Sequence, residues 1–210
     1  MKGISLNRAK YLDNRAIYKY GIHRLILMEN AGRAVAELVL KKAKPDERIL
    51  ILAGTGFNGG DGLVAGRHIY LAGRRIGVIL VGSRQRCKDE TIVQLRILEN
   101  MGLKVKEAED VAYIKRLIGR YNFIVDALLG IGLKGKVREP IYSLIAYLNS
   151  LKVKKVSVDI PSGLDADSGR PLGIALRADY TVTFVAPKRG MLTDVGRSYC
   201  GKLIVAGIGG

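Results

Sequence analysis

The sequence predicts an α/β fold in which one mostly parallel sheet carries helices on both faces. Short β-branched runs alternate with longer amphipathic stretches, a pattern typical of strand–helix units. A glycine-rich segment follows the first strand, and polar residues follow two later ones. Of the 210 residues, 48% are hydrophobic and 26% charged, the balance of a folded chain and not a disordered one. We expect a single domain over residues 1–210.

The strands are predicted from short apolar runs bounded by turn residues, at 48–54, 75–82, 103–106, 121–128, 153–160, 179–185 and 203–206. Helical periodicity is found at 26–42, 60–71, 89–100, 111–119 and 140–150. Glu29 near the start of the first helix and lysines at its end suit the helix dipole, and Pro140 suits a first helical turn. Because each of the last four helices closely follows a strand, right-handed crossovers should build one sheet.

Charge and composition exclude several classes of protein. The 35 Lys and Arg outnumber 19 Asp and Glu, and the net charge of +16 favours anionic ligands. Cys87 and Cys200 lie far apart without zinc-site spacing, so neither a zinc site nor a disulfide framework is expected. No apolar run is long enough to cross a bilayer, and the first ten residues lack the core of a signal peptide. We therefore expect a cytoplasmic protein with no membrane association.

The glycine-rich segment Gly54–Gly62 follows a strand and opens a helix, an arrangement that lets backbone amides approach an anion. It satisfies the pattern GxGxxG, but Arg84 stands where an acidic ribose ligand would follow the second strand, which disfavours an ordinary NAD dehydrogenase. Asp61 is expected in the first helical turn, where it would repel a pyrophosphate. The alternative is a tight turn in which Asp61 only stabilises the helix N-terminus.

Two further strands end in polar residues. Asp126 lies in an otherwise apolar strand, and Asp159 ends the next one, before the turn Pro161–Gly163. Three adjacent strand ends would bring the polar side chains of Asn58, Asp61, Asp126, Asp159 and Ser162 to one crevice. Their hard oxygen atoms are the ligand type of a cation that is not a transition metal. Asp126 shows no evident partner in its strand. For Asp126, Asp159 and Ser162, the alternative is that their side chains only form hydrogen bonds to local backbone amides.

Five stretches together resemble the YjeF N-terminal domain family, the NAD(P)H-hydrate epimerases. They are LMENAGRAVAELV (27–39), GTGFNGGDGLVAGRHI (54–69), VDALLGIGLKG (125–135), VDIPSGLDADSG (158–169) and ADYTVTFVAPKRGM (178–191). The resemblance covers nearly the whole chain. It implies a Rossmann-like three-layer αβα sandwich, often homodimeric, that interconverts the R and S epimers of hydrated NADH or NADPH, with a separate dehydratase as functional partner.

The resemblance also implies roles for individual residues. A potassium ion would be held by Asn58, Asp126 and Ser162. The hydrate-binding positions would be Phe57, Asn58, Gly59, Gly60, Asp61, Gly130, Ile131, Gly132, Leu133, Lys134, Gly135, Lys136 and Asp159. Phe57 departs from the family, which usually has an asparagine there, so one polar contact is lost or made by backbone.

Chemistry supports the catalytic expectation. The hydrate carries a hydroxyl next to a ring nitrogen, and either loss of that hydroxyl or ring opening needs a proton donor and acceptor, a task that the Asp159 carboxylate suits. The alternative function is a non-catalytic nucleotide- or RNA-binding scaffold of the same fold. With three Phe and no Trp, stacking platforms are scarce, so nucleic acid is expected to bind only non-specifically.

Overall fold

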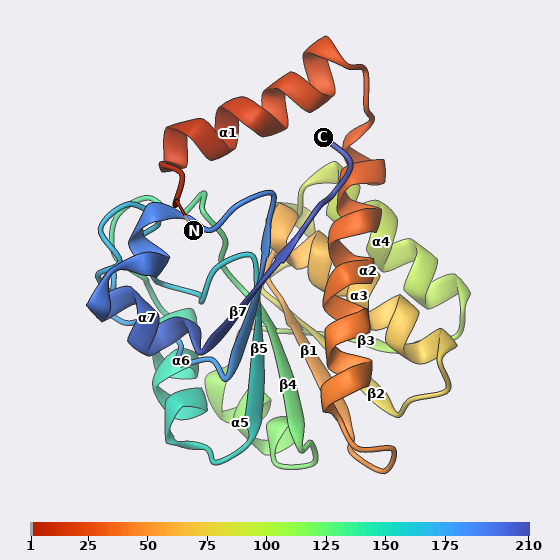
Figure 1. Cartoon of the computed structure of the whole chain (residues 1–210). Helices are drawn as coiled ribbons and strands as arrows, with labels where there is room; N and C mark the ends of the chain where they lie inside the picture. Colours follow the sequence, from red (N-terminus) through yellow and green to blue (C-terminus); the bar gives the residue numbers. More distant parts are fainter. Residues whose placement is uncertain (1) are drawn as a thin grey trace.

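In residues 2–210, which this computed structural model describes, seven strands form one sheet in the order β3-β2-β1-β4-β5-β6-β7 (Figure 1). Every neighbouring pair is parallel. The strands are β1 (Ile49–Ala53), β2 (Ile76–Val81), β3 (Val105–Ala108), β4 (Phe123–Ala127), β5 (Lys154–Val158), β6 (Tyr180–Phe184) and β7 (Lys202–Ala206). All seven predicted strands are confirmed, and the sheet is parallel throughout rather than mostly.

Helices cover both faces of the sheet, which makes three layers (Figure 1). They are α1 (Leu6–Asn14), α2 (Arg24–Lys42), α3 (Phe57–Leu71), α4 (Asp89–Asn100), α5 (Val111–Ile118), α6 (Ile141–Ser150) and α7 (Asp194–Cys200). Alternate residues of β1 divide the core: Ile49 and Ile51 pack with α2, α3 and α4, whereas Leu50 and Leu52 pack with α5 and α6. The continuous apolar run of β1 is explained by this burial on both faces.

The strand order reverses direction at β1. The chain moves outward from β1 through β2 to β3, then returns to place β4 on the other side of β1. In open α/β sheets, ligands bind beyond the carboxyl ends of the strands at such a point. The segments that follow β1 and β4 are therefore brought together.

Two differences from the sequence predictions concern helices. Helix α3 begins at Phe57 and not at residue 60, so Asp61 lies in the second turn instead of the first. Helix α1 was not predicted, because it buries only Ala9 and so presents no apolar face to the periodicity argument. Ser5 starts this helix by accepting a hydrogen bond from the amide of Arg8.

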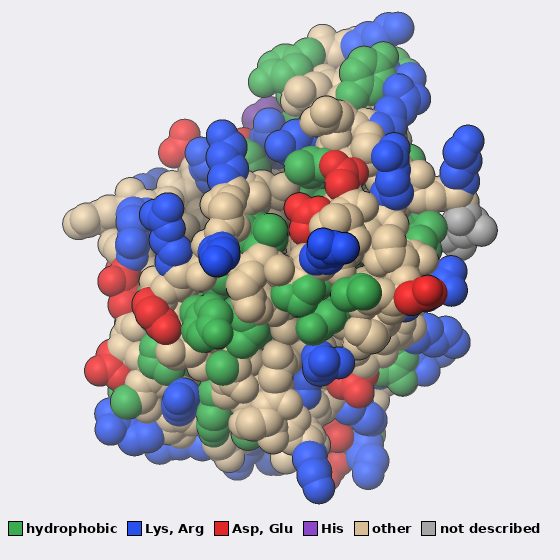
Figure 2. Space-filling model, turned by 90° about the vertical axis from the view of Figure 1, so that its left-hand side faces the viewer, with side chains coloured by type: hydrophobic (Ala, Val, Ile, Leu, Met, Phe, Trp, Pro, Cys, Tyr) green, Lys and Arg blue, Asp and Glu red, His purple; other side chains and the backbone are tan. Residues whose placement is uncertain are grey.

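The charged side chains are spread over the solvent-exposed surface of the protein. On the face drawn in Figure 2, Lys and Arg side chains are spread among acidic and apolar ones instead of gathering in one patch. Within residues 2–210, no helix combines the length and the apolar character that crossing a membrane would require.

Candidate functional site

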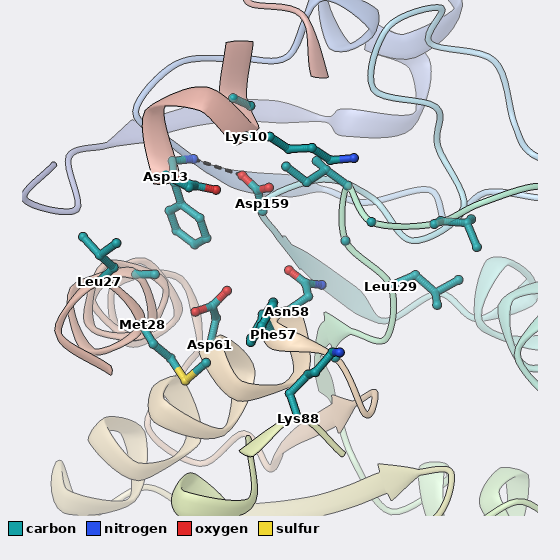
Figure 3. A pocket seen from close by; sticks show the side chains of 18 of the residues that line it. Lys10, Asp13, Leu27, Met28, Phe57, Asn58, Asp61, Lys88, Leu129 and Asp159 are labelled. Carbon is teal, nitrogen blue, oxygen red and sulfur yellow. Dashed lines mark hydrogen bonds between the residues drawn. The ribbon is translucent and has the colours of Figure 1, made fainter. Parts of the chain in front are cut away.

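A cavity of about 740 Å³ lies at the carboxyl ends of β1, β4 and β5. Helix α1 contributes Lys10 and Asp13 to its wall, and α3 contributes Asn58 and Asp61 (Figure 3). The cavity therefore lies where the strand order predicts a ligand site, and helix α1 adds a wall that the sequence patterns did not indicate.

The glycine-rich segment is shaped by close approach of backbone. A Cβ atom on Gly59 would lie 1.9 Å from the carbonyl oxygen of Gly54, and one on Gly54 would lie 2.0 Å from that of Leu128. The first turn of α3 thus rests directly on the segments that leave β1 and β4. Glycine is required here for packing, which places the polar side chain of Asn58 beside the loop after β4.

Phe57 lies at the rim of the cavity, with 38% of its surface exposed. The guanidinium of Arg24 lies 4.3 Å from the ring centroid, and the ammonium of Lys88 lies 5.9 Å from it. Arg24 also pairs with Glu90 at 3.2 Å. At the position where the family usually has asparagine, this chain therefore presents an aromatic ring flanked by two cations.

The loop after β4 divides into two parts. Of the residues expected to bind the hydrate, Gly130, Ile131, Gly132, Leu133 and Lys134 line the cavity, whereas Gly135 and Lys136 are outside its lining. The chain turns away at this point, because the amide of Val137 donates to the carbonyl of Leu172 at 2.8 Å. Gly59 and Gly60 are buried and also lie outside the lining, because α3 begins earlier than predicted.

Asp126 is fully buried and well supplied with hydrogen-bond donors, so the argument that it lacks a partner was wrong. Its Oδ2 accepts from Ser157 Oγ at 2.8 Å and from the Ser162 amide at 3.0 Å. Its Oδ1 accepts from the Ser162 hydroxyl and from the Leu128 amide. Burial raises the pKa of the carboxyl, and the hydrogen bonds from Ser162, Ser157 and Leu128 oppose that rise.

Three predicted cation ligands converge on the loop after β4. A Cβ on Gly130 would lie 3.0 Å from the Cβ of Asn58, and Ser162 Oγ accepts from the Leu129 amide at 2.9 Å. The buried Nδ2 of Asn58 has no hydrogen-bond partner within residues 2–210. With its side-chain amide turned so that the oxygen replaces the unpaired nitrogen, Asn58 would join Ser162 and Asp126 in a set of one carboxylate and two neutral oxygens, which fits a monovalent cation.

Clusters suited to a transition metal are not found in the described chain. Residues 2–210 contain no group of three or more His, Cys, Asp or Glu side chains placed to hold a metal ion. The donor set near Asn58 has only one carboxylate, a composition that favours a weakly charged cation over a divalent one.

Asp159 directly follows β5 and has a left-handed backbone, at φ 64°. Its carboxylate lines the cavity and is held from the neighbouring strand, because Oδ1 accepts from the Phe184 amide at 3.2 Å. In the turn that follows, Pro161, Ser162 and Gly163 are all buried, because they pack under the loop after β4. Asp159 alone of this segment reaches the cavity.

Two further carboxylates share the cavity with Asp159. Burial raises the pKa of Asp61 well above its ordinary range, and the charges of Asp159 and Asp13 add to the rise, against Lys188 and Arg24. Burial and Asp159 likewise raise the pKa of Asp13. The cavity therefore combines carboxyls that keep a proton to higher pH with a carboxylate paired to a lysine, the division typical of acid and base partners.

Sequence reasoning missed the residues that reach the cavity from outside the glycine-rich and strand-end segments. Asp13 and Lys10 come from the unpredicted α1, and Lys188 follows β6. Lys188 lies in the stretch 178–191 that resembles the family, shortly after the predicted strand 179–185. This position was the one indication in the sequence that Lys188 could reach the site.

Comparisons with known proteins agree with this architecture. The profile of the family described as YjeF-related protein N-terminus matches residues 24–190. The bifunctional NAD(P)H-hydrate repair enzyme Nnr of Pyrobaculum aerophilum is 41% identical over 206 residues, and this alignment covers 95% of the chain but only 40% of that protein. The NAD(P)H-hydrate epimerase of Limosilactobacillus fermentum is 37% identical, with 95% of the chain and 92% of that protein covered.

A solved structure shows the same fold. The crystal structure of yeast ynu0 superposes with a TM-score of 0.83 at 25% sequence identity, covering 98% of this chain and 87% of that one. The profile match spans most of the cavity-forming segments, although α1 lies before its first residue. The chain belongs to the family of YjeF-related protein N-termini.

Proposed function

We propose that this protein is an isomerase that interconverts the R and S epimers of hydrated NADH and NADPH. The observation that carries the proposal is the cavity at the β1–β4 switch point, in which Asp159 faces two carboxyls of raised pKa. Relatives named as NAD(P)H-hydrate epimerases match along almost their whole length. The Pyrobaculum relative, of which the chain spans 40%, is named as bifunctional, which supports a dehydratase as functional partner.

The charges and shape of the cavity suit such a substrate. Lys10, Arg24, Lys88 and Lys134 surround the cavity and would attract the phosphates. Backbone of the glycine-rich segment and of the loop after β4 can approach them closely. Because the substrate derives from NAD(P)H, we place the activity in the cytoplasm, and the family resemblance supports a homodimer.

Epimerisation requires the carbon that bears the hydroxyl to lose its configuration and regain it. In one route, the carboxylate of Asp159 accepts the hydroxyl proton, a carbonyl forms, and the carbon–nitrogen bond breaks with its electron pair moving to the nitrogen. An acid such as Asp61 donates a proton to that nitrogen. The nitrogen then attacks the other face of the carbonyl, and both proton transfers run in reverse as the ring closes. In the other route, an acid protonates the hydroxyl, water leaves, and water returns to the opposite face.

A potassium ion is proposed beside Asn58, Asp126 and Ser162. A bound cation would supply positive charge that keeps Asp126 ionised and attracts the anionic substrate. Within the protein, Ser162 and Ser157 hold the Asp126 carboxylate in place, and Asn58 offers the one buried polar group without a partner at this point of the described chain.

The proposed activity is tested with purified R hydrate and excess dehydratase specific for the S form. With the protein present, NAD(P)H should reappear at 340 nm faster than through spontaneous epimerisation. Heat-denatured protein serves as the control. If the two rates agree over a range of protein concentrations, the epimerase proposal is wrong.

A further inference from the structure

Lys188 is a buried lysine that lies against the proposed catalytic carboxylate. It is 2% exposed, and its ammonium contacts Asp159 Oδ1, Thr183 Oγ1 at 3.0 Å and the Phe184 carbonyl at 3.4 Å. Three oxygens therefore surround the ammonium, which satisfies the hydrogen-bonding capacity of a lysine. With its donors committed, Lys188 acts on the cavity through Asp159 and not through contact with a substrate.

The donors around Asp159 all converge on one of its two oxygens. Oδ1 accepts from the Lys188 ammonium, from Thr183 Oγ1 at 3.3 Å and from the Phe184 amide at 3.2 Å. Within residues 2–210, no hydrogen-bond donor reaches Oδ2. The side chain is 11% exposed and lines the cavity (Figure 3). One oxygen is thus anchored, and the other is left for a ligand.

The segment that carries Lys188 is itself held in place. The Lys188 amide lies 3.3 Å from Met191 Sδ, and the neighbouring Pro187 carbonyl accepts from the Ile4 amide at 2.9 Å. This second contact joins the strand-end segment to the chain just before α1. These contacts tie the segment of Lys188 both to Met191 and to the chain before α1, as a preorganised site requires.

We propose that Lys188 is a positioning residue for epimerisation: with Thr183 and Phe184 it fixes Oδ1 of Asp159, so that Oδ2 is the atom that exchanges the proton with substrate. The proposal rests on the proposed function. The other charged groups that line this cavity are Lys10 and Asp13 on α1, Arg24 on α2, Asp61 on α3, Lys88 before α4 and Lys134 in the loop after β4.

The test compares Lys188→Met with Lys155→Met. Lys155 is also a buried lysine, 7% exposed, but its ammonium caps the carbonyls of Leu151 and Val153 away from the cavity. We expect Lys188→Met to lower kcat about 10- to 100-fold, the effect typical of outer partners of a reactive group, with KM changed less than about threefold. Lys155→Met should keep the wild-type kcat and KM.

Two further variants cover the case in which Lys188→Met folds poorly. Thr183→Val removes one donor to Oδ1 and should lower kcat by a smaller factor, whereas Lys188→Arg keeps a charged donor and should recover part of the lost kcat. A purely structural role would reduce the folded fraction in circular dichroism and leave the kcat of the folded protein unchanged. Wild-type kcat in folded Lys188→Met would overturn the proposal.

A measurement that needs no turnover separates this inference from the proposed function. In carbon-13 NMR of the Asp side-chain carboxyls at neutral pH, the Asp159 signal should move in Lys188→Met relative to the wild type and stay in place in Lys155→Met, because Lys188 contacts Oδ1 and Lys155 does not. If that difference appears while the wild type shows no epimerase activity, the function proposal fails and the anchoring of Asp159 stands. If the signal is the same in Lys188→Met and the wild type, Lys188 does not hold this carboxylate.

Discussion

Ser162 holds Asp126 from the neighbouring strand by two contacts, one from its backbone amide to Oδ2 at 3.0 Å and one from its hydroxyl to Oδ1. The turn after β5 is thereby tied to the end of β4. Hydrogen bonds to a carboxylate favour its charged form and partly offset the burial that raises the pKa of Asp126. Asp126 is accordingly built to remain in place beneath the cavity, as a ligand would, and not to move a proton.

Asp126→Asn should therefore raise the potassium concentration needed for half-maximal activity and weaken substrate affinity, with a smaller effect on the saturated rate. The substitution removes the one negative charge of the proposed cation site. Initial rates over a matrix of potassium and substrate concentrations measure both effects, with an osmotically matched choline salt as control. Activity that is equal in potassium and in choline would exclude the cation from the reaction.

Asp159→Asn should lower kcat by about 10² to 10⁴, the usual cost of a lost acid–base group, while substrate binding is largely retained. The amide keeps the shape of the carboxylate but cannot accept the proton. Steady-state kinetics give kcat, and calorimetric binding of NADPH as a substrate analogue gives affinity. Asp194→Asn in α7, outside the cavity lining, is the matched control. A saturated rate equal to wild type would reassign the proton acceptor to Asp61.

Gly59→Ala should destabilise the fold by about 1–3 kcal/mol, the range for an overpacked site. Its Cβ would meet the Gly54 carbonyl oxygen at 1.9 Å, so either the start of α3 or the end of β1 must shift. Gly56→Ala is the control, because nothing lies within 4 Å of its Cβ and its φ of −88° suits any residue. Urea denaturation compares the two. Equal midpoints would show that the close approach is not required.

The stability of the protein should fall with rising pH through the titration of Asp61. The pKa of Asp61 is raised in the folded state above its ordinary value of 3.8, so between these values the folded protein binds more protons than the unfolded chain. Raising the pH through that window therefore favours unfolding. Asp61→Asn lacks this contribution. The free energy of unfolding of each protein is measured in urea at a series of pH values. The value for Asp61→Asn should increase relative to that of the wild type as pH rises. Parallel curves for the two proteins would contradict the assignment.

The fold was largely predictable because burial on both faces gives parallel strands a continuous apolar run. The sequence ILILA of β1 is wholly buried, and this pattern is visible without a structure. Helix α1 escaped prediction for the opposite reason, since it covers a cavity and has little core to face. A helix over a ligand site needs no apolar stripe.

The candidate site was predictable as far as the strand ends and no further. Asp126 and Asp159 were found because they interrupt apolar strands. The Ser157 hydroxyl that donates to Asp126 was not found. Ser157 lies opposite Asp126 only because of the register between β4 and β5, in which the two residues are Cα partners. Lys188 likewise meets Asp159 across 29 positions of sequence. Such pairings depend on tertiary packing, which periodicity does not encode.

The left-handed backbone at Asp159 limits what a saturation library at this position would teach. A φ of 64° is adopted readily by Asn, Asp and Gly and is avoided by branched side chains. Val or Ile at this position would be strained by the backbone, as Val185 is at φ 65°, whether or not the carboxylate reacts. Asn and Gly change the side chain with the least backbone strain. In a screen scored by activity alone, losses caused by the backbone would therefore be attributed to the carboxylate.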